Sequence, residues 1–428
     1  MKPIGNVNHL NKNPDSIERF CAKLVITGLS ASFIADWIKS SLVADTALES
    51  GLSMFASDMV MPIQWSLSTG YALFAIVLAG FLMGLQKGFI RAGIDLKIAY
   101  FGLLIWTLFM YVPDFISGFG LYEFIYFKGP ASWLSCTAIF LGASEYIWNK
   151  VKNLLKYFIL IATLLTAYSI ATSGGSDRVQ LLRELGGYVF LLQYLALWWF
   201  LSQNKKITSP LLITPIIILI ISSFLLVTRS LILTCGLYFI ARIYIDKRSS
   251  GQQNINILIL YAFIGILIFS LVIYLIYASG ILSSSFENLT ERLDEDTRSE
   301  QYVAFFSQID PSELILGKGS RATWFWQGGD YGSIDGSYTL MAFIGGLPLV
   351  ISYTYILVSG PIRILQSKLL DRNALAAAIC CLFWALALTG FGIYSVPEAK
   401  FSHYMLMIFA GRSYFVWQNT TKTFRLTR

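Results

Sequence analysis

The residues of this 428-residue chain that are best suited to chemistry lie in one polar interval, from Ser283 to Tyr338. Its charged side chains are Glu287, Glu291, Arg292, Asp294, Glu295, Asp296, Arg298, Glu300, Asp310, Glu313, Lys318, Arg321, Asp330 and Asp335. Carboxylates can accept a proton from a hydroxyl group, and arginines bind phosphate or carboxylate groups through two parallel hydrogen bonds. The interval therefore holds candidates for a general base and for an anion site.

The rest of the chain is too apolar for a soluble protein. Hydrophobic residues make up 56% of the sequence and charged residues 13%, whereas soluble domains carry about 25% charged residues. The net charge is +7, but the basic residues lie in short clusters between apolar runs, which is typical of membrane topology. The composition predicts an integral membrane protein that does not bind nucleic acid.

Twelve apolar segments come close to the ~20 residues that a membrane-spanning helix needs. They cover residues 20–44, 65–86, 97–117, 130–148, 154–172, 185–203, 209–228, 230–245, 255–279, 337–359, 374–394 and 402–418. If the N-terminus is cytoplasmic, every inside segment carries at least two basic residues, as membrane topology favours. The sequence therefore predicts an all-α transmembrane bundle of about twelve helices in one domain, residues 1–428. Both termini are then cytoplasmic, and one long external loop, residues 280–336, contains short amphipathic helices.

Cysteine and histidine give no sign of a metal or redox centre. All five cysteines lie in apolar segments without metal-binding or redox spacing, so we interpret them as small buried hydrophobic residues. The two histidines, His9 and His403, are far apart. We expect neither metal nor cofactor, and we place His403 at the external interface, away from the chemistry.

Three arginines outside the polar interval also fall on the predicted external side. Arg229 lies in the tight corner Thr228-Arg229-Ser230 between two apolar runs. It either extends to lipid headgroups or holds a lipid phosphate. Arg178 and Arg183 either pair with the neighbouring Asp177 and Glu184 or face the same anion as Arg229.

Within the polar interval, the pattern predicts short elements. The segment after Arg298 has the apolar spacing of an amphipathic helix, which lies on the membrane or on the bundle. Gly317 and Gly319 predict a turn, and the sequence around Lys318 lacks the spacing of a phosphate-binding Walker loop. The aromatic residues Trp324, Phe325, Trp326 and Tyr331 either form an interface belt or stack on sugar rings.

Asp335 closes the interval immediately before the next apolar helix. As an N-cap it stabilises that helix; as a base it activates a substrate at the membrane surface. Gly332 and Gly336 on either side leave room for a bound molecule. Glu291, Glu300 and Asp330 remain alternative bases.

Together these motifs resemble the O-antigen polymerase and ligase superfamily of bacterial inner-membrane glycosyltransferases. The resemblance rests on the Thr-Arg-Ser corner, the late external loop with an arginine near its start, the sequence LGKGS, and Asp-Gly-Ser-Tyr at the entry to the next helix. It covers residues 210–360 as motifs and the remainder only as topology. Ligases often have His-Asn where this chain has Asp335, so the resemblance favours a polymerase-like member.

The resemblance implies a metal-independent, inverting transfer in the inner membrane, with the active site facing the periplasm or cell exterior. The donor is a glycan on undecaprenyl diphosphate, and the acceptor is a hydroxyl group of another lipid-linked repeat unit of an O-antigen or exopolysaccharide. It implies catalytic roles for Asp335, Arg298 and Arg229. Further residues would bind the diphosphate or the glycan, namely Arg178, Arg183, Arg292, Arg321 and Tyr338.

The expected partners are the lipid-linked glycan, membrane lipid and a chain-length regulator protein. Two other functions remain open. A ligase would transfer the finished glycan to a lipid or protein acceptor. A flippase or polysaccharide exporter would move the glycan without chemistry, but the helix interiors hold few of the ionisable groups that transport pathways use.

Overall fold

The structure is a computed structural model of the whole chain. It describes residues 14–50, 63–116, 118, 124, 129–172, 178–205, 209–226, 229–249, 297–319, 321–326, 328–332, 334, 336–367, 371–391 and 400–426. Within this part the chain is almost entirely helical, and a single two-stranded sheet is the exception. The predicted all-α class is therefore confirmed.

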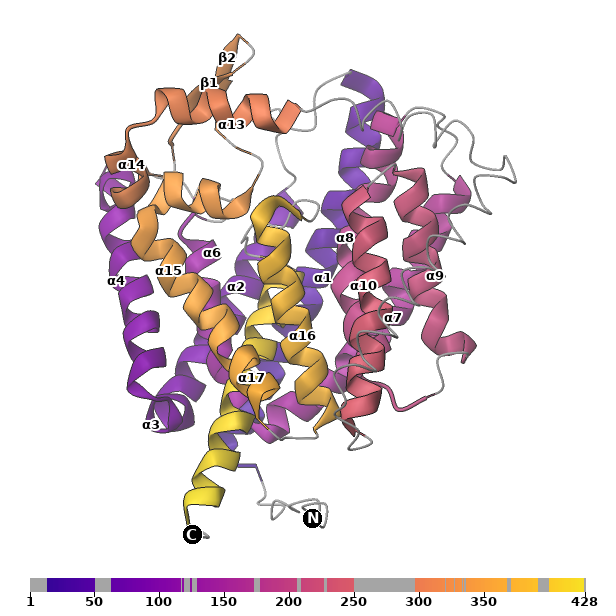
Figure 1. The fold of residues 1–428 in the computed structure, drawn as a ribbon, viewed down its shortest axis with the longest axis vertical. Helices are drawn as coiled ribbons and strands as arrows, with labels where there is room; N and C mark the ends of the chain where they lie inside the picture. Colours follow the sequence, from indigo (N-terminus) through magenta and orange to yellow (C-terminus); the bar gives the residue numbers. More distant parts are fainter. Residues whose placement is uncertain are drawn as a thin grey trace.

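The helices form one upright bundle with a small cap across one end (Figure 1). The bundle comprises α1 (Ser16–Ser50), α2 (Ile63–Met83), η1 (Gly84–Gly88), α3 (Phe89–Arg91), α4 (Ile94–Ile116), α6 (Ala131–Leu134), η2 (Ser135–Ala143), α7 (Glu145–Thr172), α8 (Arg178–Ser202), α9 (Pro210–Leu225), α10 (Arg229–Ser249), α15 (Ser337–Gln366), α16 (Arg372–Leu386), η3 (Ala387–Phe391) and α17 (Phe401–Leu426). The cap comprises α13 (Thr297–Gln308), α14 (Pro311–Leu316), β1 (Trp324–Trp326) and β2 (Gly329–Tyr331). We call its side of the bundle the cap end.

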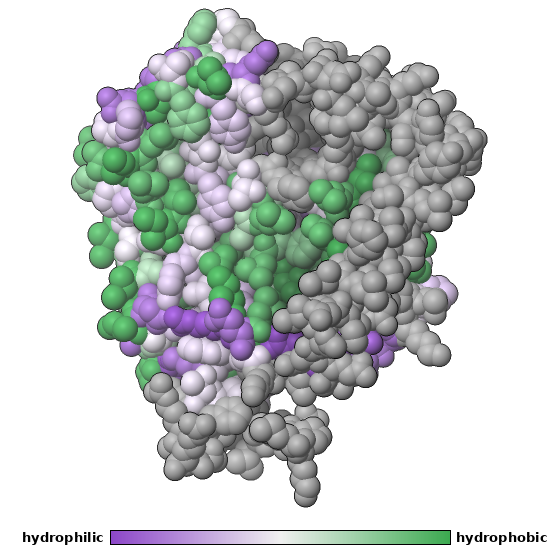
Figure 2. All heavy atoms as spheres, viewed as in Figure 1, coloured by the Kyte–Doolittle hydropathy of each residue, from purple (hydrophilic) through white to green (hydrophobic). Residues whose placement is uncertain are grey.

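Seven of the described helical segments are long and apolar enough to cross a membrane. They cover Ser16–Lys39, Leu67–Arg91, Ile94–Val112, Glu145–Thr172, Leu185–Ser202, Ser337–Gln366 and Arg372–Thr389. Apolar side chains such as Ile105, Phe109 and Ile351 are about two-thirds exposed on their outer faces. Figure 2 shows this apolar surface as green side chains between purple polar side chains at both ends of the bundle. Such a surface belongs in lipid, so the chain is a membrane protein.

Eleven of the twelve predicted spans contain helix in the structure; the ninth, 255–279, lies outside the described residues. The predicted break near residues 149–153 is wrong, because the chain breaks at Ser144. The Ser144 hydroxyl accepts a hydrogen bond from the Ile147 N–H at 3.2 Å and caps the first turn of α7. Lys150 and Lys152 therefore lie on α7 instead of in a loop.

The fourth predicted span is an unusual helix. Its longer part, η2, is a nine-residue 3-10 helix in which every residue is buried. Such helices seldom exceed four residues, but they rise about 2.0 Å per residue against 1.5 Å for an α-helix, so a short segment covers more depth. Glycines let neighbouring backbones approach it: a Cβ on Gly80 of α2 would lie 2.5 Å from Thr137 O, and one on Gly411 of α17 would meet Ile139 O.

The tenth predicted span, 337–359, lies within the apolar helical segment Ser337–Gln366, but this helix is broken near its middle. Gly346 in the middle of α15 adopts φ 73° and ψ 173°, which breaks the helix into two segments. The first, Ser337–Gly345, lies across the cap end, and the second crosses the bundle (Figure 1). Pro348 follows the break, as is common where a helix cannot continue. The crossing part of α15 therefore begins after Gly346.

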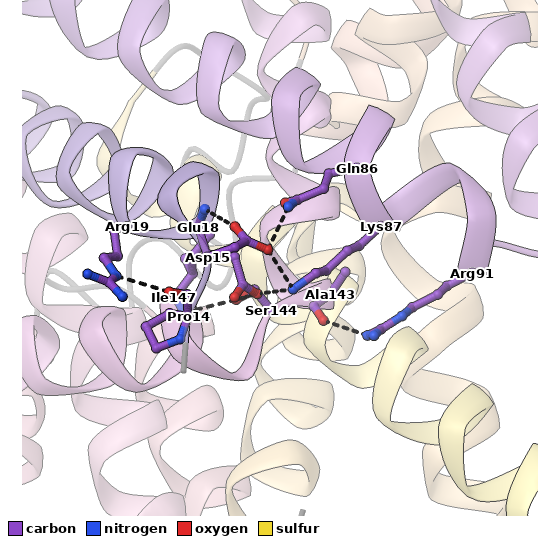
Figure 3. A network of polar contacts seen from close by, with 10 residues as sticks. All are labelled: Pro14, Asp15, Glu18, Arg19, Gln86, Lys87, Arg91, Ala143, Ser144 and Ile147. Carbon is purple, nitrogen blue, oxygen red and sulfur yellow. Dashed lines mark hydrogen bonds and ion pairs between the residues drawn. The ribbon is translucent and has the colours of Figure 1, made fainter. Parts of the chain in front are cut away.

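The bundle end opposite the cap is joined by polar contacts that we call the polar belt. Its first part links α1, η1 and the start of α7 (Figure 3). Lys87 Nζ lies 2.6 Å from Glu18 Oε1, and the Gln86 amide donates to Asp15 at 2.7 Å. Ser144 Oγ donates to Glu18 at 2.8 Å. Gln86 and Lys87 lie on the π-helical turn η1, and both reach α1.

Further links carry the belt around the bundle. Arg412 of α17 pairs with Glu145 of α7. Asp95 of α4 accepts hydrogen bonds from Arg363 at 2.5 Å and from Tyr414 at 3.1 Å. The guanidinium of Arg363 also lies over the rings of Tyr414 and Trp417, with centroid distances of 5.5 and 4.7 Å. These contacts hold α4, α7, α15 and α17 together at one level.

In the remainder of the belt, arginines bind the carbonyl ends of helices. Arg242, 1% exposed, donates to Phe200 O and Lys205 O at the end of α8. Arg248, 4% exposed, donates to Ile364 O, Leu365 O and Ser367 O at the end of α15. Arginine satisfies carbonyls that a helix leaves unpaired and complements the negative end of the helix dipole, an effect of ~0.3–2 kcal/mol each.

Candidate functional site

The polar interval folds into a cap with its own small core. Phe305 of α13 is buried, and its ring lies 5.3 Å from that of Trp324 and 5.1 Å from that of Phe343 in the first segment of α15. α13 therefore packs its buried face on protein. Of the two placements that the sequence left open, on the membrane or on the bundle, the structure shows the second for this face. Val303 and Phe306 on its other side are 72% and 51% exposed.

The LGKGS sequence attaches this cap to the break in α15. The N–H groups of Lys318 and Gly319 donate to Phe343 O and Ile344 O at 2.8 and 2.9 Å. Gly317 and Gly319 both have positive φ, 84° and 91°, so the predicted turn is confirmed. A Cβ on Gly317 would lie 2.6 Å from Gly346 N. The glycines therefore allow two backbones to meet and cap the C-terminal end of the segment Ser337–Gly345.

The contacts of Lys318 and the helix cap of Asp310 stabilise the corner where this sequence meets α15. Lys318 Nζ lies 3.1 Å from Glu313 Oε1 and 5.8 Å from the centroid of the Phe343 ring. Asp310 caps α14 and accepts hydrogen bonds from the hydroxyl and N–H of Ser312 at 2.7 and 2.8 Å. These bonds hold the pKa of Asp310 below its ordinary value. Lys318 is thus engaged within the fold.

α13 carries one predicted site residue, and it contacts the chain next to another. Arg298 is the second residue of α13, as the sequence predicted. Tyr302 follows one turn later on the same helix face. A Cβ on Gly336 would collide with the Tyr302 hydroxyl, so the two residues are in close contact. Gly336 directly follows Asp335, which lies outside the described residues, as Arg292 does.

Arginines are the first described residues of two further helices at the cap end. Arg178 is the first residue of α8 and Arg229 is the first residue of α10, while the other ends of both helices lie in the polar belt. For Arg178, Arg183, Arg229 and Arg298 the structure describes the backbone alone. Residues 173–177, 227–228 and 250–296 lie outside the described residues, so α8, α10 and α13 are described only from Arg178, Arg229 and Thr297 onward. Three helices therefore carry an arginine at or next to their first described residue.

Two predicted binding residues have described side chains. Arg321 is exposed in the turn before β1 and makes no hydrogen bond or ion pair to any residue the structure describes. Tyr338 lies in the first turn of α15, half-buried, and packs against the main core of the bundle. Arg321 therefore suits binding of an anion, whereas the Tyr338 ring is committed to packing.

His403, placed at the interface from sequence, is wholly buried. Ser135 Oγ lies 3.1 Å from its Nδ1 and donates its own proton to Ser132 O, so Nδ1 must be the donor. Tyr353 OH lies 3.1 Å from Nε2 and accepts from Trp384 Nε1, so Tyr353 donates to Nε2. Both ring nitrogens are thus satisfied by a neutral imidazole. The structure gives His403 a packing role that its sequence position did not reveal.

No family model, no curated protein and no solved structure matches this chain. The likeness of its motifs to the O-antigen polymerase and ligase superfamily therefore stays a resemblance. The cap end remains the candidate site because it holds Arg321, which has no pair among the described residues, together with Arg178, Arg229 and Arg298. Tyr302 joins the candidates, since it lies beside Gly336; its Arg-x-x-x-Tyr spacing from Arg298 was the available signal.

Proposed function

We propose that this protein is a membrane glycosyltransferase that polymerises lipid-linked repeat units of an O-antigen or exopolysaccharide at the outer face of the bacterial inner membrane. The observation that carries the proposal is that Arg178, Arg229 and Arg298 lie at the cap end, at or next to the first described residues of α8, α10 and α13. A diphosphate is an anion that these guanidinium groups would stabilise together. Its lipid tail would remain in the bilayer beside the bundle.

The chemistry assigns each group a task. A hydroxyl group of the acceptor sugar attacks the anomeric carbon of the donor, while the bond from that carbon to the diphosphate oxygen breaks. Arg229 and Arg298 stabilise the negative charge that develops on the leaving diphosphate, with Arg178, Arg183, Arg292 and Arg321 as further cations. Asp335 accepts the hydroxyl proton. Arginines that neutralise the diphosphate make a bound metal unnecessary.

Replacing the leading arginines tests this assignment. Arg229→Lys and Arg298→Lys keep the charge but lose the two-bond geometry for phosphate. We expect single repeat units to accumulate and long chains to disappear, at wild-type protein abundance, when lipid-linked glycans are resolved by size on a gel. Lys156→Ala, at an exposed position on α7, is the control. Normal chain lengths in both arginine variants would refute the proposed roles.

The same assay separates the alternatives. A ligase variant would keep long lipid-linked polymer and fail only to attach it to the final acceptor. An exporter would need no transfer reaction at all. Transfer between two lipid-linked repeats by the purified protein alone, unaffected by a metal chelator, is the result expected of the polymerase.

A further inference from the structure

The hairpin of the cap has two chemically different faces. Strand pairing places Trp324 opposite Tyr331, Phe325 opposite Asp330, and Trp326 opposite Gly329. Side chains alternate between faces along a strand. Trp324, Trp326 and Tyr331 therefore share the inner face. The ring centroid of Trp324 lies 5.6 Å from that of Trp326 and 6.4 Å from that of Tyr331. Phe325 and Asp330 share the outer face.

The outer pair is brought close by its position in the ladder. The Phe325 N–H donates to Gln308 Oε1 at 3.0 Å, and Phe325 O accepts from Gln308 Nε2 at 2.9 Å. Both backbone groups of Phe325 thus point away from β2. Phe325 and Asp330 therefore form a non-hydrogen-bonded pair, whose Cα atoms lie only about 4.5 Å apart. The ring and the carboxylate stand side by side.

Phe325 and Asp330 are held in fixed positions, but their side chains contribute little to the stability of the fold. Gln308 fixes the edge of β1 to α13, and Trp324, 4% exposed, anchors the inner face in the core of the cap. On the outer face Phe325 is 57% exposed. Asp330 is also exposed and makes no hydrogen bond or ion pair to a described residue. A phenylalanine opposite an aspartate in solvent adds little to strand stability.

The position of the hairpin points away from lipid as its partner. β1 and β2 project beyond α13 at the tip of the cap, away from the bundle (Figure 1). The exposed apolar side chains of α4 and α15 form the surface suited to lipid, and the hairpin extends past it. An aromatic ring here would meet a water-soluble ligand.

We propose that Phe325 and Asp330 bind one sugar unit of a neutral glycan. The apolar C–H face of a pyranose ring packs on an aromatic ring, and a carboxylate accepts strong hydrogen bonds from two adjacent hydroxyl groups. The carboxylate also disfavours acidic sugars through charge repulsion. This inference rests on the proposed function for the source of the glycan, and it adds a subsite beyond the arginines, where the growing or accepting chain is held.

Binding of released glycan by the purified protein tests the subsite. The probe is the oligosaccharide mixture freed by mild acid from the lipid-linked glycans of the producing cells. The protein is kept in a detergent without a sugar headgroup, and affinity is measured by titration calorimetry. We expect Phe325→Ala and Asp330→Asn each to weaken binding about tenfold or more. Phe306→Ala and Val303→Ala, which alter an exposed phenylalanine and an exposed valine on α13, should bind like wild type.

Melting temperatures equal to wild type show that the variants are folded. Wild-type affinity in both hairpin variants, equal losses in the α13 controls, or no binding by the wild type would each overturn the proposal. The proposal would also be overturned if the two hairpin variants lost binding to phosphatidylglycerol vesicles but still bound the glycan. The proposed function fails separately: normal chain lengths in the Arg229 and Arg298 variants would refute the polymerase roles while leaving the binding result intact.

Discussion

The two ends of the bundle use the same residue in opposite ways. In the polar belt, Arg242 and Arg248 are almost fully buried and donate to carbonyls at helix C-termini, where the dipole favours a cation. At the cap end, Arg178, Arg229 and Arg298 lie at or next to the first described residues of α8, α10 and α13. Belt arginines therefore stabilise the fold, whereas we propose that the cap arginines bind an anion.

The ion pairs divide in the same manner. Among the residues that the structure describes, the pairs of Lys87, Arg242, Arg363, Arg372 and Arg412 all lie in the belt. The cap contributes the pair of Lys318 with Glu313, within one corner of the loop. Arg321 of the cap has no such pair with a residue that the structure describes, which supports the anion site proposed for that end.

The largest effect should come from breaking the belt. Arg242→Met removes a buried cation from Asp246 and uncovers the carbonyls of Phe200 and Lys205. Asp246 is 38% exposed and keeps its pair with Arg372, so the main cost is that of the unsatisfied carbonyls, about 1–3 kcal/mol each. We expect the melting temperature in detergent to fall by several degrees or the protein not to accumulate. Lys156→Met, at an exposed position of α7, should leave it unchanged. An unaltered melting temperature for Arg242→Met would contradict the role of the belt.

The next effect should distinguish two glycines of the cap. Gly317→Ala combines positive φ with a collision against Gly346, whereas Gly319→Ala also has positive φ but open space around it. Positive φ alone costs about 1–2 kcal/mol for alanine. Gly317→Ala should therefore expose residues 297–345 to amide hydrogen exchange far more than Gly319→Ala. Equal exchange in both variants would show that the contact with α15 is unimportant.

The smallest effect should be the acid sensitivity of α14. Ser312 holds the pKa of Asp310 below its ordinary value. The stabilisation of α14 by the Asp310 N-cap is therefore complete above the unfolded pKa of about 3.9 and is lost as pH falls through the lower, folded pKa. Amide exchange in α14 should rise below about pH 4. Asp310→Asn should flatten this rise, and a variant that keeps it would exclude Asp310 as its cause.

The long helices and the polar interval could be predicted because apolar length and clustered charge are local properties. The belt could not, since its pairs join positions such as Asp95 and Arg363 that only folding brings together. The N-cap at Ser144 and the Gly-Gly-Leu-Pro break in α15 were readable but were missed, because a hydropathy pattern continues across both. Burial of His403 depended on Ser135 and Tyr353, which belong to other helices.

In the candidate site, the start of α13 at Arg298 and the turn at Gly317 followed from local sequence. The hairpin did not, although WFWQGGDY alternates aromatic residues around a Gly-Gly pair, a hairpin signal. The contact of Tyr302 with Gly336 required the fold of the cap. Asp335 remains the predicted base.

The most direct test of the central claim compares arginines from both ends in one experiment. Arg229→Met and Arg298→Met are set against Arg242→Met and Arg248→Met, and each variant is scored for melting temperature and for glycan chain length in cells. The account predicts wild-type melting temperatures with only single repeat units for the cap variants, and lowered melting temperatures for the belt variants. Cap variants that are destabilised like the belt variants, or that still make long chains, would contradict it.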